Sequence, residues 1–362
     1  MKILHVEAGK HLYGGARQVL YIAEGLATRG VDNLLACPSG SEMSRQQPAG
    51  VRVLPMKMGG DGDIGLALRL ARLIHAEKPD LVHLHSRRGA DTWGGLAAKL
   101  AGVPCVLSRR VDNPESRLAV AIKYRLYDHV ITISEGIRQV LLGEGLAPGK
   151  VSCVRSAVDA TPYLVPVEGA AFRAEFGLPA DALVAGVVAQ LIPRKGHRYL
   201  LAALPELLQR YPALQVLIFG QGPLEAELRA EVAKHGLADV VHFTGFRHDL
   251  ARWIGGLDML VHPADMEGLG VSLLQASAAG VPIITSRAGG LPEAVQDEVT
   301  GILCPPGDVP ALTAAVARLA ADPALRRRFG AAGRARILAE FSIAGMVEGN
   351  LNIYRQVLEA CK

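Results

Sequence analysis

Residues 262–293 read HPADMEGLGVSLLQASAAGVPIITSRAGGLPE, and we interpret the rest of the chain from this stretch. A polar turn with two acids, Asp265 and Glu267, leads through Gly268 and Gly270 into an apolar helix expected over 271–279. A β-branched strand and a second Gly-Gly corner follow. A loop that opens a helix beside a carboxylate offers free N–H groups and a positive dipole end, which suit a ligand with phosphate and hydroxyl groups. An ordinary loop–helix–strand unit of an α/β domain is the alternative.

The composition is that of a globular protein with two domains. The chain has 362 residues, 50% hydrophobic and 20% charged, and this length exceeds one ordinary core. No apolar run reaches the ~18–20 residues of a membrane span. Aromatic residues make up 5%, too few for a platform that stacks single-stranded nucleic acid, so no nucleic acid partner is expected. Scattered cysteines without a CxxC, and a first strand where a signal peptide would stand, indicate a cytoplasmic protein.

Charge is unevenly spread along the chain. Residues 1–165 hold 21 Lys and Arg against 15 Asp and Glu, whereas the remainder holds 18 against 20. This basic front half fits either a solvated surface or an anionic partner, such as a phosphorylated or membrane-bound acceptor. The second interpretation predicts peripheral contact with the inner face of a membrane.

Strands and helices alternate through both halves of the chain, which predicts two doubly wound α/β domains. The first domain is expected over 1–165. It begins with a strand (2–7), then a corner with Gly14 and Gly15 that opens a helix. This corner is not GxGxxG, and no GxxxxGK[ST] is present, so neither a dinucleotide fingerprint nor a P-loop is found. The strand PDLVHLHS (79–86) ends at His85, at the sheet edge where parallel strands present ligand-binding residues.

The second domain, expected over 166–342, carries two further candidate motifs. PRKGH (193–197) places Arg194 and Lys195 after a buried strand and at the mouth of a helix. These cations form a candidate clamp for a diphosphate, with a solvated loop as the alternative. GQGP (220–223) ends another strand, and Gly220 and Gly222 would let a flat base approach the backbone. The Asp-x-Asp in GGDGD (59–63) is interpreted as a surface turn rather than a metal site.

Together these motifs resemble a known family, the retaining glycosyltransferases of family 4. The resemblance covers nearly the whole chain and rests on GGARQVLYIAEGLATRG, PDLVHLHS, RKG, FGQGP, VHFTGF, DMLVHP, EGLGVSLLQASAAGVPIITS, GGLPE and TGILCPPGD, in family order. It implies the GT-B fold, two facing Rossmann-like domains, with a last helix (343–362) that crosses back to the first domain. The Arg-Lys-Gly version resembles the subgroup that builds lipopolysaccharide core.

The resemblance also implies roles for individual residues. Arg194 and Lys195 would hold the donor diphosphate as it leaves, and Glu267 would bind hydroxyls of the donor sugar. His85 would lie beside the sugar and the acceptor. The remaining donor-binding positions are Gly14 and Gly15 near the diphosphate, Gly220 and Gly222, the N–H groups around Gly268, Leu269, Gly270 and Val271, and Gln275 at the ribose. The family generally needs no metal ion, and the expected donor is a UDP-sugar with no separate cofactor.

Three positions depart from the family pattern. Gln275 stands where the second glutamate of Glu-x7-Glu usually binds the ribose, and an amide is a weaker partner for a hydroxyl than a carboxylate. Ala189-Gln190 replaces the frequent Gly-Arg, and RSAVD (155–159) replaces Asn-Gly-Val-Asp. The implied function is transfer of a hexose-type sugar to a lipid-linked, lipopolysaccharide or polysaccharide acceptor. A sugar-nucleotide epimerase of the same fold and a non-catalytic nucleotide-sugar binder are the alternatives.

Overall fold

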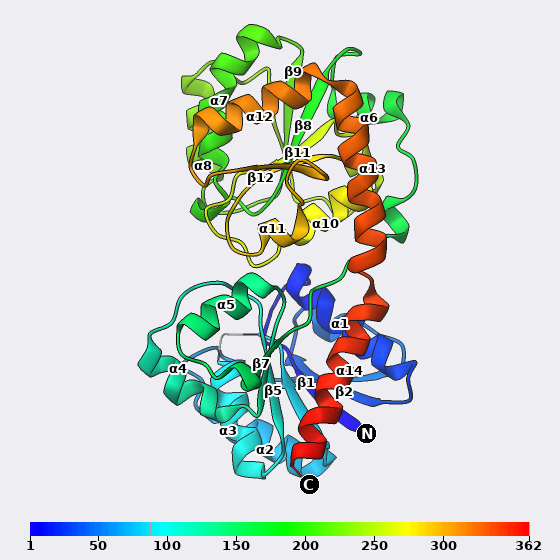
Figure 1. The fold of residues 1–362 in the computed structure, drawn as a ribbon. Coiled ribbons are helices and arrows are strands. Elements are labelled where there is room, and N and C mark those ends of the chain that lie inside the picture. Colours follow the sequence, from blue (N-terminus) through cyan, green and yellow to red (C-terminus); the bar gives the residue numbers. More distant parts are fainter. Residues whose placement is uncertain (87–88, 362) are drawn as a thin grey trace. The chain divides into compact units, whose positions relative to one another are not determined.

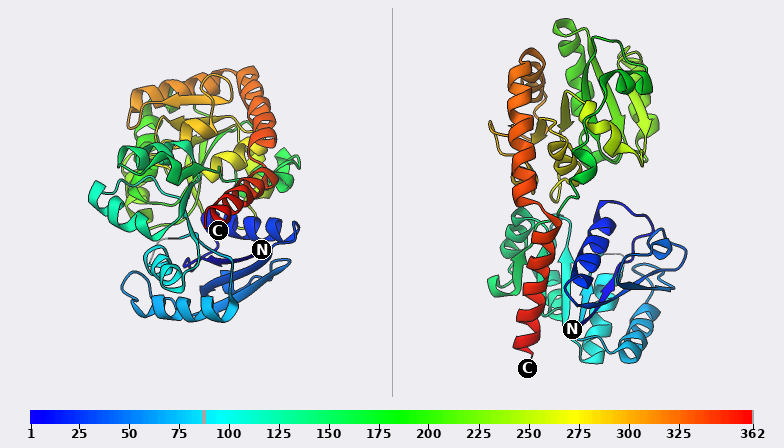
Figure 2. Two further views of the ribbon diagram at one scale, coloured as in Figure 1. Left: turned by 60° about the horizontal axis from the view of Figure 1, so that its bottom comes forward. Right: turned by 90° about the vertical axis from the view of Figure 1, so that its right-hand side faces the viewer.

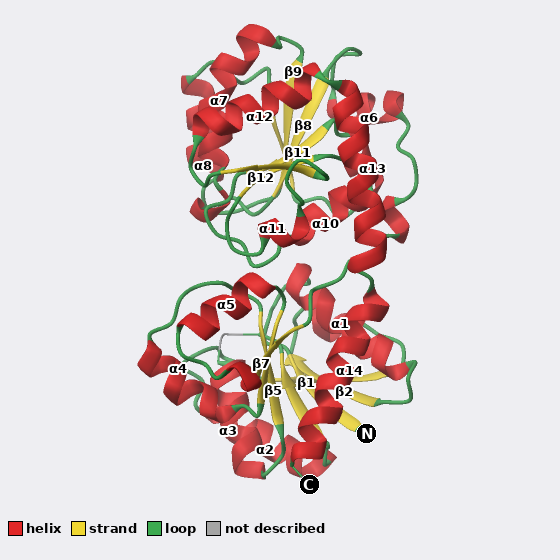
Figure 3. Cartoon of the chain, in the orientation of Figure 1, coloured by secondary structure: helices red, strands yellow, loops and turns green. Residues whose placement is uncertain are grey.

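The computed structural model describes residues 1–86 and 89–361 and divides the chain into two compact units. Unit 1 contains Met1–Ala157 and the segment from Ile343 onward, and unit 2 contains Val158–Ser342. The first division falls a little before position 165, the expected end of the first domain. The last position of the helix expected over 343–362 lies outside the described residues. Each unit is a three-layer α/β structure in which strands lie between helices (Figure 3).

Unit 1 is built on a parallel sheet of seven strands in the order β3-β2-β1-β4-β5-β6-β7. The strands are β1 (Lys2–Val6), β2 (Asp32–Pro38), β3 (Val51–Met56), β4 (Leu81–Leu84), β5 (Cys105–Arg109), β6 (His129–Thr132) and β7 (Val151–Cys153). The helices are α1 (Gly14–Ala27), α2 (Gly65–Glu77), α3 (Ala90–Ala101), α4 (Arg117–Lys123), α5 (Glu135–Gly143) and α14 (Ile343–Ala360). The strand order reverses between β1 and β4, and such a switch point is where open α/β sheets bind ligands.

The two faces of this sheet are covered by different helices, as successive side chains of a strand point to opposite faces. Ile3 and Leu81 pack with Ile22 of α1 and Tyr354 of α14. Neighbouring strand residues such as Leu4 pack on the opposite face, against α2 to α5. α1 and α14 lie side by side in both Figure 1 and Figure 2. The last helix, far away in sequence, is therefore part of the core of unit 1.

Unit 2 repeats this architecture with six parallel strands in the order β10-β9-β8-β11-β12-β13. The strands are β8 (Leu183–Val188), β9 (Leu214–Phe219), β10 (Val241–Gly245), β11 (Met259–His262), β12 (Ile283–Ser286) and β13 (Gly301–Cys304). The helices are α6 (Gly169–Phe176), α7 (His197–Arg210), α8 (Glu225–Lys234), α9 (Leu250–Trp253), α10 (Val271–Ala278), α11 (Leu291–Ala294), α12 (Val309–Ala321) and α13 (Pro323–Glu340). Its switch point lies between β8 and β11.

These findings confirm the predicted fold class, two doubly wound α/β units with parallel sheets. Helix α4 is short and runs only from Arg117 to Lys123. The Ser116 hydroxyl caps its start by accepting a hydrogen bond from the Ala119 N–H, and a 3-10 turn (Tyr124–Leu126) follows it. Among the described residues, no helix has the length and apolar character needed to cross a bilayer.

Candidate active site

The switch point of unit 2 brings the two sequence motifs of that unit together. The turn Pro193–Lys195 follows β8, and the loop with Glu267 follows β11, the neighbouring strand. The Lys195 ammonium forms an ion pair with the Glu267 carboxylate, although the two residues are 72 positions apart. Both side chains are largely buried, with 10% and 15% of their surfaces exposed. The ion pair is therefore shielded from the screening that weakens surface pairs.

A close backbone approach holds the two loops in place. Gly196 has φ +70°, and a Cβ there would lie 1.9 Å from the Pro263 carbonyl oxygen. The Asp265 N–H donates to the Arg194 carbonyl at 2.9 Å, and the Tyr199 hydroxyl donates to the Asp265 carboxylate at 2.8 Å. Only glycine fits at position 196 with this geometry. The glycine of RKG thus places the lysine beside its glutamate.

Glu267 has two further partners besides Lys195. The His262 Nε2–H donates to its carboxylate at 3.2 Å, and the Gly268 N–H donates to the other oxygen at 3.1 Å. Burial raises the pKa of Glu267, but His262 and Lys195 outweigh it, so the pKa lies well below its usual range. Burial lowers the pKa of His262, which keeps the ring neutral. Glu267 is therefore a fixed carboxylate at neutral pH.

Arg194 differs from Lys195 in its surroundings. Its side chain is half-buried, and among the described residues no carboxylate lies within ion-pair distance of it. Because the charge of Lys195 is matched by Glu267, the uncompensated cation of this turn is Arg194. An anionic ligand at this edge would meet that charge first.

The start of α10 contributes backbone donors next to Glu267. Gly270 is the residue before the helix, with φ +82° and no side-chain cap. The N–H groups of the first turn therefore have no side-chain acceptor, and the positive end of the helix dipole is open to a ligand. Leu269 is 1% exposed and belongs to the core, whereas Val271 and Gln275 are half-buried on α10. Position 269 thus offers its backbone rather than its side chain.

Gly220 and Gly222 are packed against protein backbone on the side where a Cβ would stand, and the expected approach of a flat base to them stays a prediction. A Cβ at Gly220 would lie 1.9 Å from the Ala189 carbonyl oxygen, and one at Gly222 would lie 2.5 Å from that of Leu191. These glycines let the end of β9 pack against the chain that leaves β8.

In unit 1, His85 lies one residue beyond β4 and is only 1% exposed. Its Nε2 is 2.9 Å from His5 Nδ1, and its Nδ1 is 3.4 Å from the Arg110 guanidinium. The ring therefore contacts protein on both sides. Gly14 and Gly15 open α1, and a Cβ at Gly15 would lie 3.7 Å from the Arg110 side chain.

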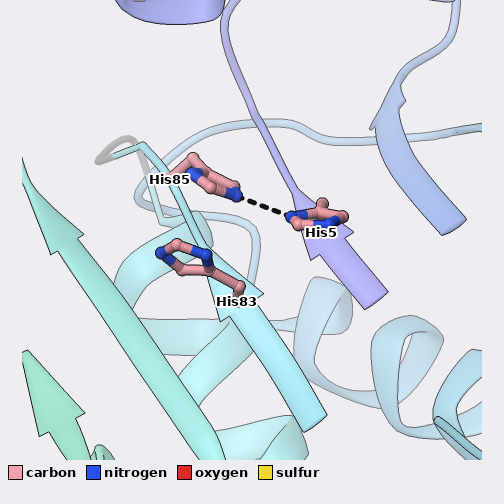
Figure 4. Close-up of side chains that lie close together, drawn as sticks. All are labelled: His5, His83 and His85. Carbon is pink, nitrogen blue, oxygen red and sulfur yellow. Dashed lines mark hydrogen bonds between the residues drawn. The ribbon is translucent and has the colours of Figure 1, made fainter. Parts of the chain in front are cut away.

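His5, His83 and His85 form a buried cluster at the switch point of unit 1 (Figure 4). Each ring could offer a nitrogen to a metal ion, and these nitrogens lie within 4.8 Å of one another. The nitrogens already have hydrogen-bond partners, however: His83 contacts the Tyr354 hydroxyl at 2.5 Å and the Ser108 hydroxyl at 2.9 Å. A metal ion would have to displace such bonds beside the cation of Arg110, so these contacts are those of hydrogen-bonded imidazoles.

Sequence reasoning missed four residues at these two edges: His262, His197, His5 and Arg110. His262 ends β11 and His5 lies in β1, so a search for polar residues near strand ends would have found both. His197 begins α7, is 3% exposed, and neither ring nitrogen has a hydrogen-bond partner. Arg110 follows β5 directly and belongs to no recognisable motif.

Comparison with known proteins gives matches over almost the entire chain. Residues 170–336 match the family described as glycosyl transferases group 1, and residues 13–161 match glycosyltransferase family 4. The chain is 30% identical to glycogen synthase from Mycobacterium tuberculosis, over 94% of this chain and 90% of that protein.

Two other similar proteins have more specific descriptions. A GDP-mannose-dependent alpha-(1-6)-phosphatidylinositol monomannoside mannosyltransferase from Mycolicibacterium smegmatis is 38% identical over 53% of this chain and 50% of that protein. Among solved structures, Anabaena Alr3699/HepE in complex with UDP superposes with a TM-score of 0.86. That match has 20% identity and covers 98% of this chain and 100% of that one, so it concerns the fold.

Proposed function

The chain belongs to the glycosyl transferases of group 1 and family 4 and has the GT-B fold, and from this premise we propose a specific reaction. It moves a hexose-type sugar from a nucleotide-diphosphate donor, a UDP-sugar, to a lipid-linked, lipopolysaccharide or polysaccharide acceptor. The transfer retains the configuration of the anomeric carbon and requires no metal ion.

The observation that carries this proposal is the buried Lys195–Glu267 pair at the switch point of unit 2, next to the uncapped start of α10. Cleavage of a sugar–phosphate bond leaves charge on the diphosphate. Arg194, Lys195 and the N–H groups of the helix start can stabilise this charge without a cation from solution. Glu267, held ionised, can accept hydrogen bonds from sugar hydroxyls. Loss of the diphosphate and capture by the acceptor hydroxyl then need no protein base, because the leaving phosphate can take the proton.

A lipid-linked acceptor is supported by a similar protein and by the surface of α4. The mycolicibacterial relative is described as acting on a phosphatidylinositol mannoside. On α4, Leu118 and Ile122 are 71% and 62% exposed, and they lie one helical turn apart beside Arg117. Apolar side chains next to a basic residue suit the interface of an anionic membrane. We propose peripheral contact there and a cytoplasmic location.

The experiment that tests the function is a panel of nucleotide sugars, read first by thermal shift and then by transfer. The donor should raise the melting temperature by mass action, and the free nucleotide should appear only when an acceptor glycolipid is present. Nucleotide release without acceptor, with a changed sugar, would favour the epimerase. Binding without turnover, made tighter by Gln275→Glu, would favour the binder. No response to any nucleotide sugar would contradict all three.

A further inference from the structure

A continuous chain of hydrogen bonds runs through the interior of unit 1 from Arg110 to the backbone of Val31. The Arg110 guanidinium contacts His85 Nδ1 at 3.4 Å and the His85 carbonyl oxygen at 3.3 Å. His85 Nε2 contacts His5 Nδ1 at 2.9 Å, the bond drawn in Figure 4. His5 Nε2 contacts the Asn33 amide oxygen at 3.0 Å, and the Asn33 amide nitrogen donates to the Val31 carbonyl at 2.8 Å.

The two ends of this chain fix the proton on each histidine. A guanidinium can only donate, so His85 Nδ1 must carry a lone pair and its proton must lie on Nε2. That proton is donated to His5 Nδ1, which leaves the proton of His5 on Nε2, where the Asn33 carbonyl oxygen accepts it. Both rings are thus neutral and in the same Nε2–H form.

Burial agrees with this assignment. Burial lowers the pKa of His5 to about 4, with the Asn33 hydrogen bond acting in the other direction. It also lowers the pKa of His85, with His83, His5 and Arg110 adding to the effect. A second proton on His85 would point an N–H at the guanidinium. The chain of bonds is therefore intact only while both rings are neutral.

Among the residues linked by these hydrogen bonds, Arg110 is the one placed to meet a ligand. His85, His5 and Asn33 are each no more than 1% exposed, whereas Arg110 is only partly buried. Its side chain passes Gly15 at the start of α1, a helix without a side-chain cap or an acid in its first turn. Burial lowers the pKa of the Arg110 guanidinium, although the nearby Glu7 carboxylate acts in the other direction.

We propose that Arg110, rather than His85, contacts the substrate at this edge through a phosphate group, and that His5 and Asn33 are positioning residues that hold His85 beneath it. The inference rests on the proposed function, because a sugar nucleotide and a phosphorylated acceptor both carry such a group. Arg110 donates to the phosphate with the guanidinium N–H groups that face away from His85. His85 sets the direction of the guanidinium through its lone pair and its carbonyl oxygen.

The test is isothermal titration of the full chain with UDP, and with inorganic phosphate in the presence and in the absence of UDP. Arg110→Met, which keeps the length of the stem, should weaken binding at least tenfold. Weaker UDP binding would identify the donor diphosphate, and weaker phosphate binding alone would identify an acceptor phosphate. Arg45→Met, which removes an exposed arginine of the same unit, should change neither. Unchanged binding of both ligands to Arg110→Met would overturn the proposal.

The positioning role is tested by a double-mutant cycle. His5→Asn should weaken binding several-fold in the natural chain and should have no effect in the Arg110→Met background, since it acts through Arg110. Equal effects in both backgrounds would show that His5 is merely structural. If His5→Asn does not fold, nitrogen NMR of the unmodified protein decides: His5 and His85 should both be neutral with the proton on Nε2. A proton on Nδ1 of either ring would contradict the assignment.

These outcomes are separable from a failure of the proposed function. If no nucleotide binds, that function is wrong, while the phosphate titration without UDP and the NMR assignment still report on Arg110 and the two histidines. If nucleotide sugars bind and transfer but Arg110→Met behaves as the unmodified chain does, the function stands and this inference fails.

Discussion

At the scale of single residues, the unit 2 site depends on a charge balance among Lys195, Glu267 and Arg194. Lys195 is paired with Glu267 inside the protein, and Glu267 is also held by His262. Lys195 fixes the Glu267 carboxylate and also adds positive charge near the start of α10. Its removal should therefore affect both the sugar and the diphosphate of a donor.

We expect Lys195→Ala to weaken binding of the nucleotide-diphosphate sugar by about 1–3 kcal/mol, the scale of a lost charge-assisted hydrogen bond. The measurement is calorimetric titration with the donor found in the panel. Lys234→Ala serves as the control, because Lys234 is an exposed lysine on α8 of the same unit. Superimposable titration curves for Lys195→Ala and the unmodified chain would remove Lys195 from the proposed site.

A second prediction at this scale concerns acid sensitivity. Burial lowers the pKa of His197 to about 4, and His262 and Lys195 add to the effect. An unfolded histidine titrates near 6.5, so between about pH 6.5 and 4 the unfolded state binds more protons than the folded state, and stability falls as the pH falls. The free energy of unfolding of the unmodified chain should therefore fall by about 2–3 kcal/mol more over this pH range than that of His197→Asn.

Urea unfolding measured at several pH values checks the acid prediction. The exposed His248→Asn is the matched control and should follow the unmodified chain. Parallel curves for His197→Asn and the unmodified chain across this window would show that His197 does not titrate as expected.

At the scale of elements, the glycine between the Arg-Lys turn and α7 fixes the geometry of the site. We expect Gly196→Ala to destabilise the protein by more than about 2 kcal/mol, because the new Cβ would clash with the Pro263 carbonyl and the φ is positive. Gly236→Ala is a control with a similar φ of +65° and open space around it, so it should cost only about 1 kcal/mol. Denaturant unfolding measures the stability of both variants. An equal loss of stability in the two would mean that the close approach of Gly196 to the Pro263 carbonyl is unimportant.

The exposed face of α4 makes a prediction about membranes. Replacing Ile122 by Glu should reduce sedimentation of the protein with vesicles that contain anionic lipid, because it removes an apolar side chain and adds a repelled charge. Leu338→Glu, at an exposed apolar position of α13, is the matched control. Equal binding of both variants would argue against contact through α4.

Much of this arrangement could be predicted from the sequence, because strand, corner and helix alternate with clear periodicity. The strand ends also located Arg194, Lys195 and Glu267 at one edge. The contact between Lys195 and Glu267 could not be predicted from spacing, since it depends on β8 and β11 being neighbours. Arg110 could not be found because it belongs to no motif, and its place depends on the packing of the first sheet.

At the scale of the whole molecule, the proposed reaction predicts that the chain itself supplies the positive charge and that no metal ion is needed. Treatment with EDTA, followed by removal of the chelator, should leave the transfer rate unchanged within about twofold, because Arg194, Lys195 and the start of α10 provide the positive charge. Addition of Mg²⁺ or Mn²⁺ should not raise the rate. A rate that falls on chelation and returns with one metal ion would show that metal independence is wrong.

The return of the chain to unit 1 has a consequence for synthesis on the ribosome. Tyr354 and Val357 of α14 belong to the core of unit 1, which begins at Met1. Unit 2 is encoded entirely between the two parts of unit 1, so all its residues emerge before that core can close. Unit 1 is thus begun before unit 2 and completed after it. While unit 2 is being translated, the apolar sheet face that α14 will cover is exposed, and in this period the nascent protein would most need a chaperone.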